Sequence, residues 1–594
     1  MVWRFACILY PSTFILFLFL AGCSGGERPL STDNRVIEWE LADADALNPF
    51  NSSSANANDL EEHIYQRLIG IDVKTMKYDI PVLADSMPVV SPDHLQYDFV
   101  LRKDIKWADG LPFTGADVIF SLKALKDPYD VESAQSRVYV DPIDSAMLIN
   151  GDPYHVRFVF SKPYFLAIPA IFGSTLYILP KHLLDPKDLT DHYSWQALAV
   201  AAKNPDSIAL SKPEKQAMQQ FATWFSDAKR NRDPQYVLGT GPYKLDAWVT
   251  NQYTRLVRNP YYVNQWGPEF EANPDILLYK TINDFNAAAT ALKSHDVDLL
   301  GDIPSEFWVR IDTNHNELKR TAFPLGQFAY IGFNEKSPLF SDPAVRWAMA
   351  YMINRPMIIK KLLFGMAKLT QSPVPSTRPE HDSDLPIIPF DPAKAEHILD
   401  SLGWKDHDGD GIRDKVINGK RIPFKFTFTV NAGNNTRMQV LLIYAEALKK
   451  IGIDASVNTL EWSVYLERLR DHLLDAHLGG WITDPYEADE YQLYHSSQSK
   501  NGGSNADSYS DPKADKLMVD IRQEFDPVKR LAMERQLQEI MYQDQANLFL
   551  WEPLNTAAWL DRFDSVTWNG YHPGYNAATW KVRGAASGGA KATF

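Results

Sequence analysis

Cysteine is almost absent from this chain, which has two in 594 residues, Cys7 and Cys23. Cys7 lies inside an apolar N-terminal segment, so the chain that follows Cys23 contains no cysteine with which to form a disulfide. A chain of this length buries enough surface to fold without crosslinks. We therefore expect a hydrophobic core alone to stabilise the protein.

Familiar catalytic and cofactor motifs are also missing. The sequence has no nucleophile elbow, glycine-rich phosphate loop, paired-cysteine zinc site or HExxH helix. Its 14 histidines are scattered, and the spacing of His472 and His477 does not place both on one helix face. We expect these histidines to be structural, and we expect neither enzymatic activity nor a cofactor.

The chain has fewer basic than acidic side chains, 60 against 75, and its formal net charge is -15. This balance disfavours nucleic acid and anionic lipid surfaces as partners. No apolar run beyond the N-terminal segment is long enough to cross a bilayer. With 45% hydrophobic residues, the rest of the chain is expected to be a large soluble globule with two or more domains.

The N-terminus carries a targeting signal. Arg4 precedes an apolar stretch from Phe5 to Leu20, which is shorter than the ~20 apolar residues of a membrane span and leads into Ala21, Gly22 and Cys23. This pattern resembles the bacterial lipoprotein signal, in which residues 1–22 are removed and Cys23 is lipidated. The alternative is an ordinary signal peptide with an accidental cysteine.

The lipoprotein interpretation predicts an extracytoplasmic protein, in the periplasm or at the cell surface, that is anchored to the membrane through Cys23. Residues 23–34 are rich in Gly, Ser, Pro and charged residues and have no apolar period. We expect this segment to be a flexible leader between the lipid and the fold.

Strand and helix patterns alternate along the remaining chain, which is typical of α/β domains. Near the start they predict a strand at Val36–Leu41 and a helix from about Asp59 to Leu68. Later, Phe424–Val430 alternates as a half-buried strand, a helical face follows, and Ile453–Val457 alternates as a second strand. This βαβ unit should be parallel and right-handed.

A further strand is predicted at Ala476–Ile482. In open α/β sheets, ligands collect beyond the carboxyl ends of the strands. The residues at that end, Trp481, Ile482, Thr483 and Asp484, are therefore the first candidates for a binding site.

One acidic loop resembles the start of an EF-hand. Asp406, Asp408, Asp410 and Asp414 take its first, third, fifth and ninth positions. Ile417 occupies the twelfth position, where a bidentate glutamate should be. The loop is either a weak calcium site or a solvated acidic turn, and we expect no metal.

Several stretches together resemble the extracytoplasmic solute-binding proteins of family 5, the peptide-binding receptors of ABC importers. The resemblance extends over almost the whole mature chain. Its motifs are LRKDIKWADGLPFTGADVIFSL at 101–122, GTGPYKL at 239–245 followed by RNPYY at 258–262, and the stretch from Tyr330 to Asn334 with the later Asp342–Arg346 and Asn354-Arg355.

The resemblance implies an α/β, two-lobe periplasmic-binding-protein fold with a hinge and an extra small domain on lobe I. It places lobe I at 35–75, 178–303 and 547–594, the small domain at 76–177 and lobe II at 304–546. It also implies that lobe closure around a peptide precedes delivery to an ABC permease in the inner membrane. We expect a monomer.

Within the resemblance, Trp481 and Asp484 match the positions at which peptide-binding members have a tryptophan and the aspartate that pairs with the peptide's α-ammonium group. A carboxylate in a dry crevice would hold such a cation strongly. The alternative is that Asp484, which precedes Pro485, starts a turn. By similarity, the peptide backbone should add as a strand along Gly480, Ile482 and their neighbours and near Ser53, Ser54 and Ala55.

The chain departs from the family in a charged insertion between Pro186 and Pro234 and in the run from Pro485 to Asp489. The second departure leaves ligand size open, and no residue for the peptide carboxylate follows from the resemblance. Alternative cargoes on the same fold are an oligosaccharide, an opine or a metal chelate. A lipid-anchored hydrolase with two distant carboxylates is the alternative from another class.

Overall fold

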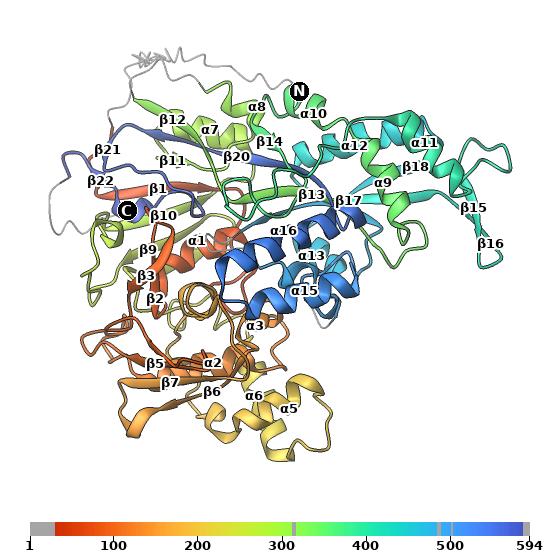
Figure 1. The fold of residues 1–594 in the computed structure, drawn as a ribbon. Helices are drawn as coiled ribbons and strands as arrows, with labels where there is room; N and C mark the ends of the chain where they lie inside the picture. The colour runs from red at the N-terminus through yellow and green to blue at the C-terminus, as the bar shows by residue number, and fades with distance from the viewer. Residues whose placement is uncertain (1–29, 312–316, 484–488, 501–502, 586–594) are drawn as a thin grey trace, which may run out of the picture.

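A mixed sheet of twelve strands runs through the whole protein (Figure 1). The computed structural model describes residues 30–311, 317–483, 489–500 and 503–585. The strand order is β18-β17-β19-β13-β20-β11-β1-β10-β9-β8, and β12 and β14 pair with β20 beside this path. The strands are β1 (Arg35–Glu40), β8 (Tyr243–Val249), β9 (Tyr253–Arg258), β10 (Ile276–Thr281), β11 (Leu299–Leu300), β12 (Leu318–Pro324), β13 (Gln327–Phe333), β14 (Ala367–Leu369), β17 (Lys425–Asn431), β18 (Asp454–Leu460), β19 (Ala476–Ile482) and β20 (Leu548–Leu560).

The long strand β20 connects the two halves of this sheet. Its first residues, from Leu548, pair with β13. Its later residues, from Leu554, pair with β12, and Ala558 and Trp559 also pair with β11. Strands β12 and β13 follow each other in sequence and pair with different parts of β20, so the chain passes between the two halves here as well. When few segments pass between two halves, and do so at one place, a hinge motion needs little backbone change.

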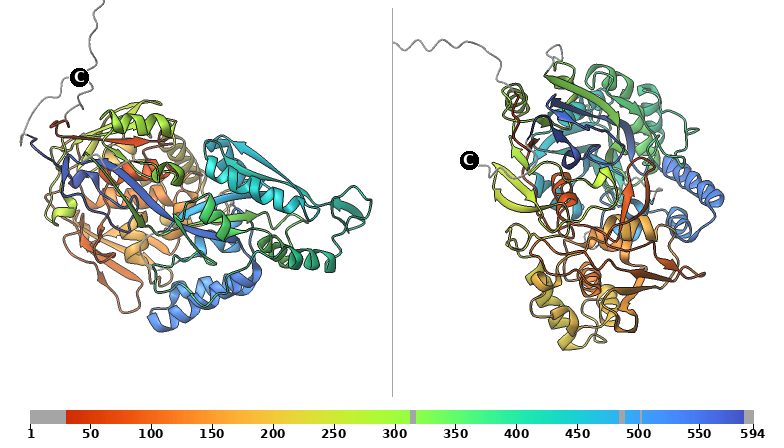
Figure 2. Two further views of the ribbon diagram at one scale, coloured as in Figure 1. Left: turned by 90° about the horizontal axis from the view of Figure 1, so that it is seen from above. Right: turned by 90° about the vertical axis from the view of Figure 1, so that its left-hand side faces the viewer.

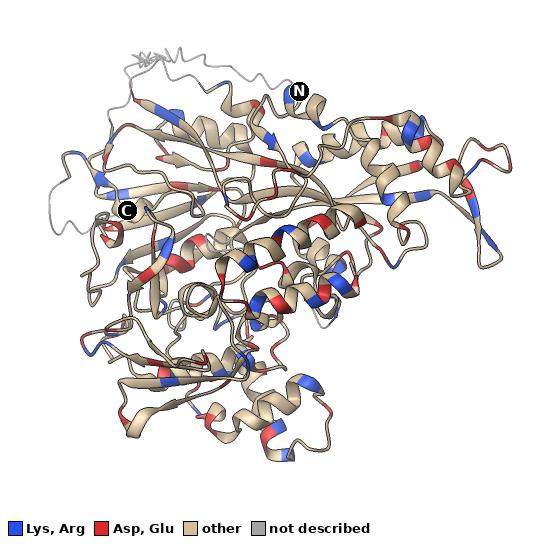
Figure 3. Ribbon diagram, viewed as in Figure 1, with Lys and Arg blue, Asp and Glu red and all other residues tan. Residues whose placement is uncertain are grey.

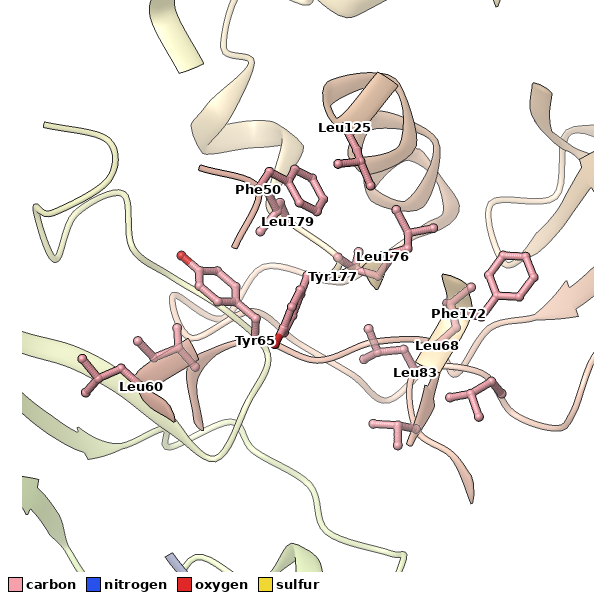
Figure 4. Close-up of a cluster of buried hydrophobic side chains, with 14 of the residues drawn as sticks. Phe50, Leu60, Tyr65, Leu68, Leu83, Leu125, Phe172, Leu176, Tyr177 and Leu179 are labelled. Carbon is pink, nitrogen blue, oxygen red and sulfur yellow. The ribbon is translucent and has the colours of Figure 1, made fainter. Parts of the chain in front are cut away.

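Hydrophobic cores form on both sides of this crossing. The first contains Phe50, Tyr65 and Phe172, and Figure 4 shows these rings among the leucines that surround them. The second contains Phe424, Phe426 and Phe428, all at most 5% exposed. Each half therefore buries its own set of large side chains, as expected for a chain of several domains.

The predicted βαβ unit is confirmed as a parallel pair of strands joined by a helix, and its right-handed connection stays a prediction. Strand β17 buries Phe426, Phe428 and Val430, and it pairs with β18 in parallel over its whole length. Helix α12 (Asn435–Lys449) joins the two strands and is followed by Gly452, whose φ of +80° favours glycine. The strand predicted at Ala476–Ile482 has those bounds, whereas β17 and β18 extend beyond the predicted Val430 and Val457 to Asn431 and Leu460.

The first helix begins earlier than predicted. Helix α1 covers Ala55–Ile64, because the Ser54 hydroxyl accepts a hydrogen bond from the Ala57 backbone N–H and caps it. The serines before it read as loop in the sequence, but the last of them is a cap. Strand β1 ends one residue before the predicted Leu41.

A second sheet has the order β4-β5-β7-β6 and lies at the lower left of Figure 1. Its strands are β4 (Val89–Val90), β5 (Gln96–Val100), β6 (Ile143–Leu148) and β7 (His155–Phe160). The charged insertion after Pro186 forms α5 (Trp195–Lys203) and α6 (Lys212–Phe225). These helices lie at the far end of the molecule from β17 and β18, as Figures 1 and 2 show.

The remaining elements complete both halves. The other short strands are β2 (Ile69–Asp72), β3 (Lys77–Pro81), β15 (Asp414–Ile417), β16 (Lys420–Pro423), β21 (Phe563–Asp564) and β22 (Lys581–Val582). The other α-helices are α2 (Gly115–Lys126), α3 (Ala134–Val140), α4 (Lys181–Leu184), α7 (Phe285–Lys293), α8 (Ser305–Trp308), α9 (Pro343–Tyr351), α10 (Arg355–Lys361), α11 (Pro392–Ser401), α13 (Trp462–Arg470), α14 (Tyr491–Tyr494), α15 (Pro512–Gln523) and α16 (Pro527–Asp544).

Acidic and basic side chains are interspersed over the whole ribbon in Figure 3. The formal net charge of -15 is therefore spread along the chain and not gathered in one element. In the described part of the chain, no helix combines the length and the apolar character that a membrane span needs.

Candidate functional site

The predicted site residues lie at the carboxyl end of β19. This strand pairs with β13 along its whole length, from Ala476 to Ile482. Gly480 is exposed, Trp481 is partly buried, and Ile482 is 41% exposed. Thr483 continues along β13, because its backbone N–H donates to the Gly326 carbonyl at 2.7 Å. These residues therefore lie at the carboxyl end of β19, the end at which ligands collect in α/β folds.

Two of the predicted functional residues fall outside the described ranges. Asp484, predicted to bind an ammonium group, lies in the segment 484–488, and Cys23, predicted to be lipidated, lies in 1–29. Both assignments stay predictions. The described chain resumes at Asp489.

Ser53, Ser54 and Ala55 have local roles in the structure. The hydroxyls of Ser53 and Ser54 each donate to the Asp45 carboxylate at 2.8 Å. Ala55 is the first residue of α1. None of the three lines the cavities beside Trp481 and Thr483. Their predicted contact with a ligand backbone stays a prediction.

Two cavities adjoin the end of β19 and share Thr483 and Arg378 in their walls. The larger, which we call the cleft, has a volume of about 910 Å³. One wall includes Gly326, Arg378 and Thr483, and the opposite wall includes Tyr78, Phe165 and Trp568. The smaller cavity, of about 80 Å³, is lined by residues that include Pro373, Trp481 and Asp489. The cleft volume lies at the upper end of the range for small-molecule sites.

Asp489 connects the two walls. The Tyr164 hydroxyl donates to Asp489 Oδ2 at 2.7 Å, and Arg522 Nη2 lies 2.8 Å from the same oxygen. The three side chains are at most 7% exposed. Burial alone would lower the pKa of Arg522, but the Asp489 carboxylate outweighs burial and holds that pKa above its usual range. Arg522 therefore stays charged at neutral pH.

Further contacts join the same two walls. The Phe165 backbone N–H donates to the Arg522 carbonyl at 3.0 Å, and the Tyr139 hydroxyl donates to Gln492 Oε1 at 2.7 Å. The His94 and Phe525 rings stack with centroids 4.0 Å apart. The walls are therefore in direct contact at one side of the cleft, as they would be in a closed state.

Two buried carboxyl groups lie behind Asp489. Burial raises the pKa of Glu490 to about 7 and raises that of Glu534 well above its usual range. Like charges so close in an apolar setting favour the protonated form. The wall behind Asp489 therefore carries less negative charge at neutral pH than its sequence suggests.

The sequence alone did not predict the residues that line or join the walls of the cleft. Asp489 stands there only within a departure from the family, and no motif includes Tyr164, Arg378 or Arg522. The four residues lie far apart in sequence and share no period. The proline-rich run that begins at Pro373 is the one local signal that a wall of the cleft lies nearby.

The EF-hand-like loop brings three of its four carboxylates together. One oxygen each of Asp406, Asp408 and Asp414 lies within 4.8 Å of the others, and Asp410 is outside this group. The carboxylates already have partners, because Asp406 accepts the backbone N–H groups of Gly409 and Gly411. Asp414 likewise pairs with His407 and Arg421. These hydrogen-bond and ion-pair partners would compete with a cation for the carboxylate oxygens. The expectation that the loop binds no metal stays a prediction.

Comparison with known proteins gives consistent matches. The family model described as "Bacterial extracellular solute-binding proteins, family 5 Middle" matches residues 80–503. The oligopeptide-binding protein AppA of Bacillus subtilis is 28% identical over 597 residues, covering 97% of this chain and 98% of AppA.

Solved structures agree with these sequence matches. The structure of Bacillus subtilis AppA in complex with a nonapeptide has a TM-score of 0.76 at 26% identity, and covers 93% of this chain and 100% of that one. NikZ from Campylobacter jejuni in complex with Ni(L-His) has a TM-score of 0.75 at 23% identity, covering 92% and 99%. The expected α/β periplasmic-binding-protein fold with two lobes is thereby confirmed. The residue boundaries of the lobes and of the small domain stay predictions.

Proposed function

The chain belongs to the bacterial extracellular solute-binding proteins of family 5, and from this premise we propose that it is a receptor that captures peptides and delivers them to an ABC transporter. It binds its cargo by closing two lobes over the cleft and has no chemistry of its own. Its site of action is outside the cytoplasm, on a lipid attached to Cys23. AppA, which is similar over nearly the whole chain, is an oligopeptide-binding protein, and this similarity supports the peptide assignment.

The observation that carries the proposal is the open edge of β19 beside the cleft. Among the residues that the structure describes, β19 pairs on the side away from β13 with β17 only, at Ala476 and His477. Within those residues, the backbone from Leu478 to Ile482 therefore has one free edge. An extended peptide can add to such an edge through main-chain hydrogen bonds, which tolerate many side chains. A sugar or a metal chelate has no comparable use for a free strand edge.

Other cargoes remain the alternative, because a relative of the same fold is solved with Ni(L-His). The test is capture by the purified protein from mixtures of peptides, oligosaccharides and nickel-histidine, with the bound species released and identified. Recovery of intact peptides supports the proposal, and recovery of a sugar or nickel complex overturns it. Appearance of cleavage products would instead favour the hydrolase.

A further inference from the structure

Arg437 is a cation beside the open edge of β19. It lies in the first turn of α12, where its backbone N–H donates to the capping Asn434 side chain at 3.0 Å. A Cβ atom placed on Gly480 would lie 3.4 Å from Arg437 Nη2. The guanidinium therefore stands at the carboxyl ends of β17 and β19, where the two strands have separated.

The charge of Arg437 has no counter-charge in the described part of the chain. Its guanidinium has one hydrogen bond there, from Nη1 to Asn431 Oδ1 at 3.3 Å. Burial lowers the pKa of Arg437, and the hydroxyls of Tyr465 and Tyr330 offset this only in part. A guanidinium has five N–H donors, so most of its bonding capacity is unused.

Three other arginines of the same half have several partners within the fold. Arg522 pairs with Asp489, and Arg413 pairs with Asp400. Arg355 has no carboxylate, but it donates to the carbonyls of Thr370, Phe549 and Ile388. Arg437 differs from these three, because within the described ranges it has one side-chain hydrogen bond and no counter-charge, and its Nη2 atom lies close to Gly480 of β19.

We propose that Arg437 binds a carboxylate group of the ligand at the open edge of β19. The planar fork of a guanidinium matches the two oxygens of a carboxylate, and the N-terminus of α12 adds favourable electrostatic potential. The inference rests on the proposed function, since a peptide supplies this carboxylate either at its C-terminus or on an Asp or Glu side chain. It adds the recognition element that the sequence could not provide.

The test uses three synthetic pools with the same range of lengths. The first has free C-terminal acids without Asp or Glu, the second has C-terminal amides without Asp or Glu, and the third has C-terminal amides that contain Asp or Glu. Capture is measured by native mass spectrometry for the wild type and Arg437→Gln. The matched control is Arg468→Gln, which changes an exposed arginine of α13.

We expect the wild type and Arg468→Gln to favour a carboxylate-bearing pool over the carboxylate-free amides by about tenfold or more, and Arg437→Gln to lose this preference. Enrichment of the first pool identifies the C-terminus as the source, and enrichment of the third identifies a side chain. Equal capture of all pools by the wild type, or an unchanged preference in Arg437→Gln, refutes the role of Arg437 while the peptide receptor stands. Capture of no peptide refutes the proposed function, and this inference with it.

A second measurement separates binding from folding. Removal of a half-buried cation without a counter-charge should leave the ligand-free melting temperature of Arg437→Gln equal to or above that of Arg468→Gln. Arg437→Lys should retain part of the preference, because it keeps the charge and loses the fork. A clear drop in the melting temperature of Arg437→Gln would assign Arg437 to the fold and overturn the proposal.

Discussion

Replacement of Tyr164 by phenylalanine tests lobe closure with the smallest possible change. The substitution removes the hydroxyl that donates to Asp489 at 2.7 Å and leaves the Arg522 ion pair intact. A hydrogen bond to a charged group contributes about 1.5 to 3 kcal/mol. Because the bond joins opposite walls of the cleft, its loss weakens the closed state and not the separate lobes. Ligand affinity should therefore fall by about 10- to 150-fold.

The assay is a tryptophan fluorescence titration with the peptide that the wild type retains best. Tyr154→Phe is the matched control, because within the described ranges the Tyr154 hydroxyl makes no hydrogen bond and its ring contacts Lys103. The control should bind as the wild type does. A dissociation constant for Tyr164→Phe within twofold of the wild type would refute the argument that this contact stabilises closure.

Four further predictions follow from the sequence and the structure. Asp484→Asn should lower affinity for free-amine peptides by about tenfold or more, and unchanged affinity in the same titration would remove Asp484 from the site. Burial raises the pKa of Glu38 to about 8, and although burial lowers the pKa of His572, the Asp59 carboxylate outweighs it and brings that pKa to about 9. Both pKa values lie above those of the unfolded chain, so the stability that each bound proton contributes is present at low pH. It is lost as the pH rises through about 8 for Glu38 and about 9 for His572. A urea midpoint that does not fall from pH 7 to 9 would contradict this. Phe428→Ala should lower the free energy of unfolding by about 3 to 5 kcal/mol in urea denaturation, since the ring is fully buried in the core of its half, and a loss below about 1 kcal/mol would be inconsistent with that packing. Calorimetry should detect no calcium binding at micromolar concentration, because Ile417 occupies the position of the bidentate ligand, and tight binding would show that reasoning to be wrong.

Local patterns predicted the elements that position the site. The alternation at Phe424–Val430 and the strand at Ala476–Ile482 are visible in sequence because one face of each is buried. Asp342 and Asp511, each directly before a proline, cap α9 and α15, and this start signal is also local. Such signals arise within a few residues, so tertiary structure does not alter them.

Much of the candidate site could not be predicted in this way. Asp489, Tyr164 and Arg522 meet only because opposite walls of the cleft come together, and no spacing in the sequence encodes that meeting. In the sequence, Arg437 looks like an ordinary helix residue. Only the register of β17 and β19 shows that these strands separate close to it. The start of α1 was placed too late because a capping serine and a loop serine look alike in sequence.

The central claim is that the cargo is a peptide. Native mass spectrometry of the purified protein after exposure to a mixed peptide library tests it most directly, with bound species released and identified. The account predicts intact peptides with free amino ends, held in the cleft beside β19. A protein that stays empty, or that carries a sugar or a metal complex, would contradict the peptide assignment while leaving the fold unchanged.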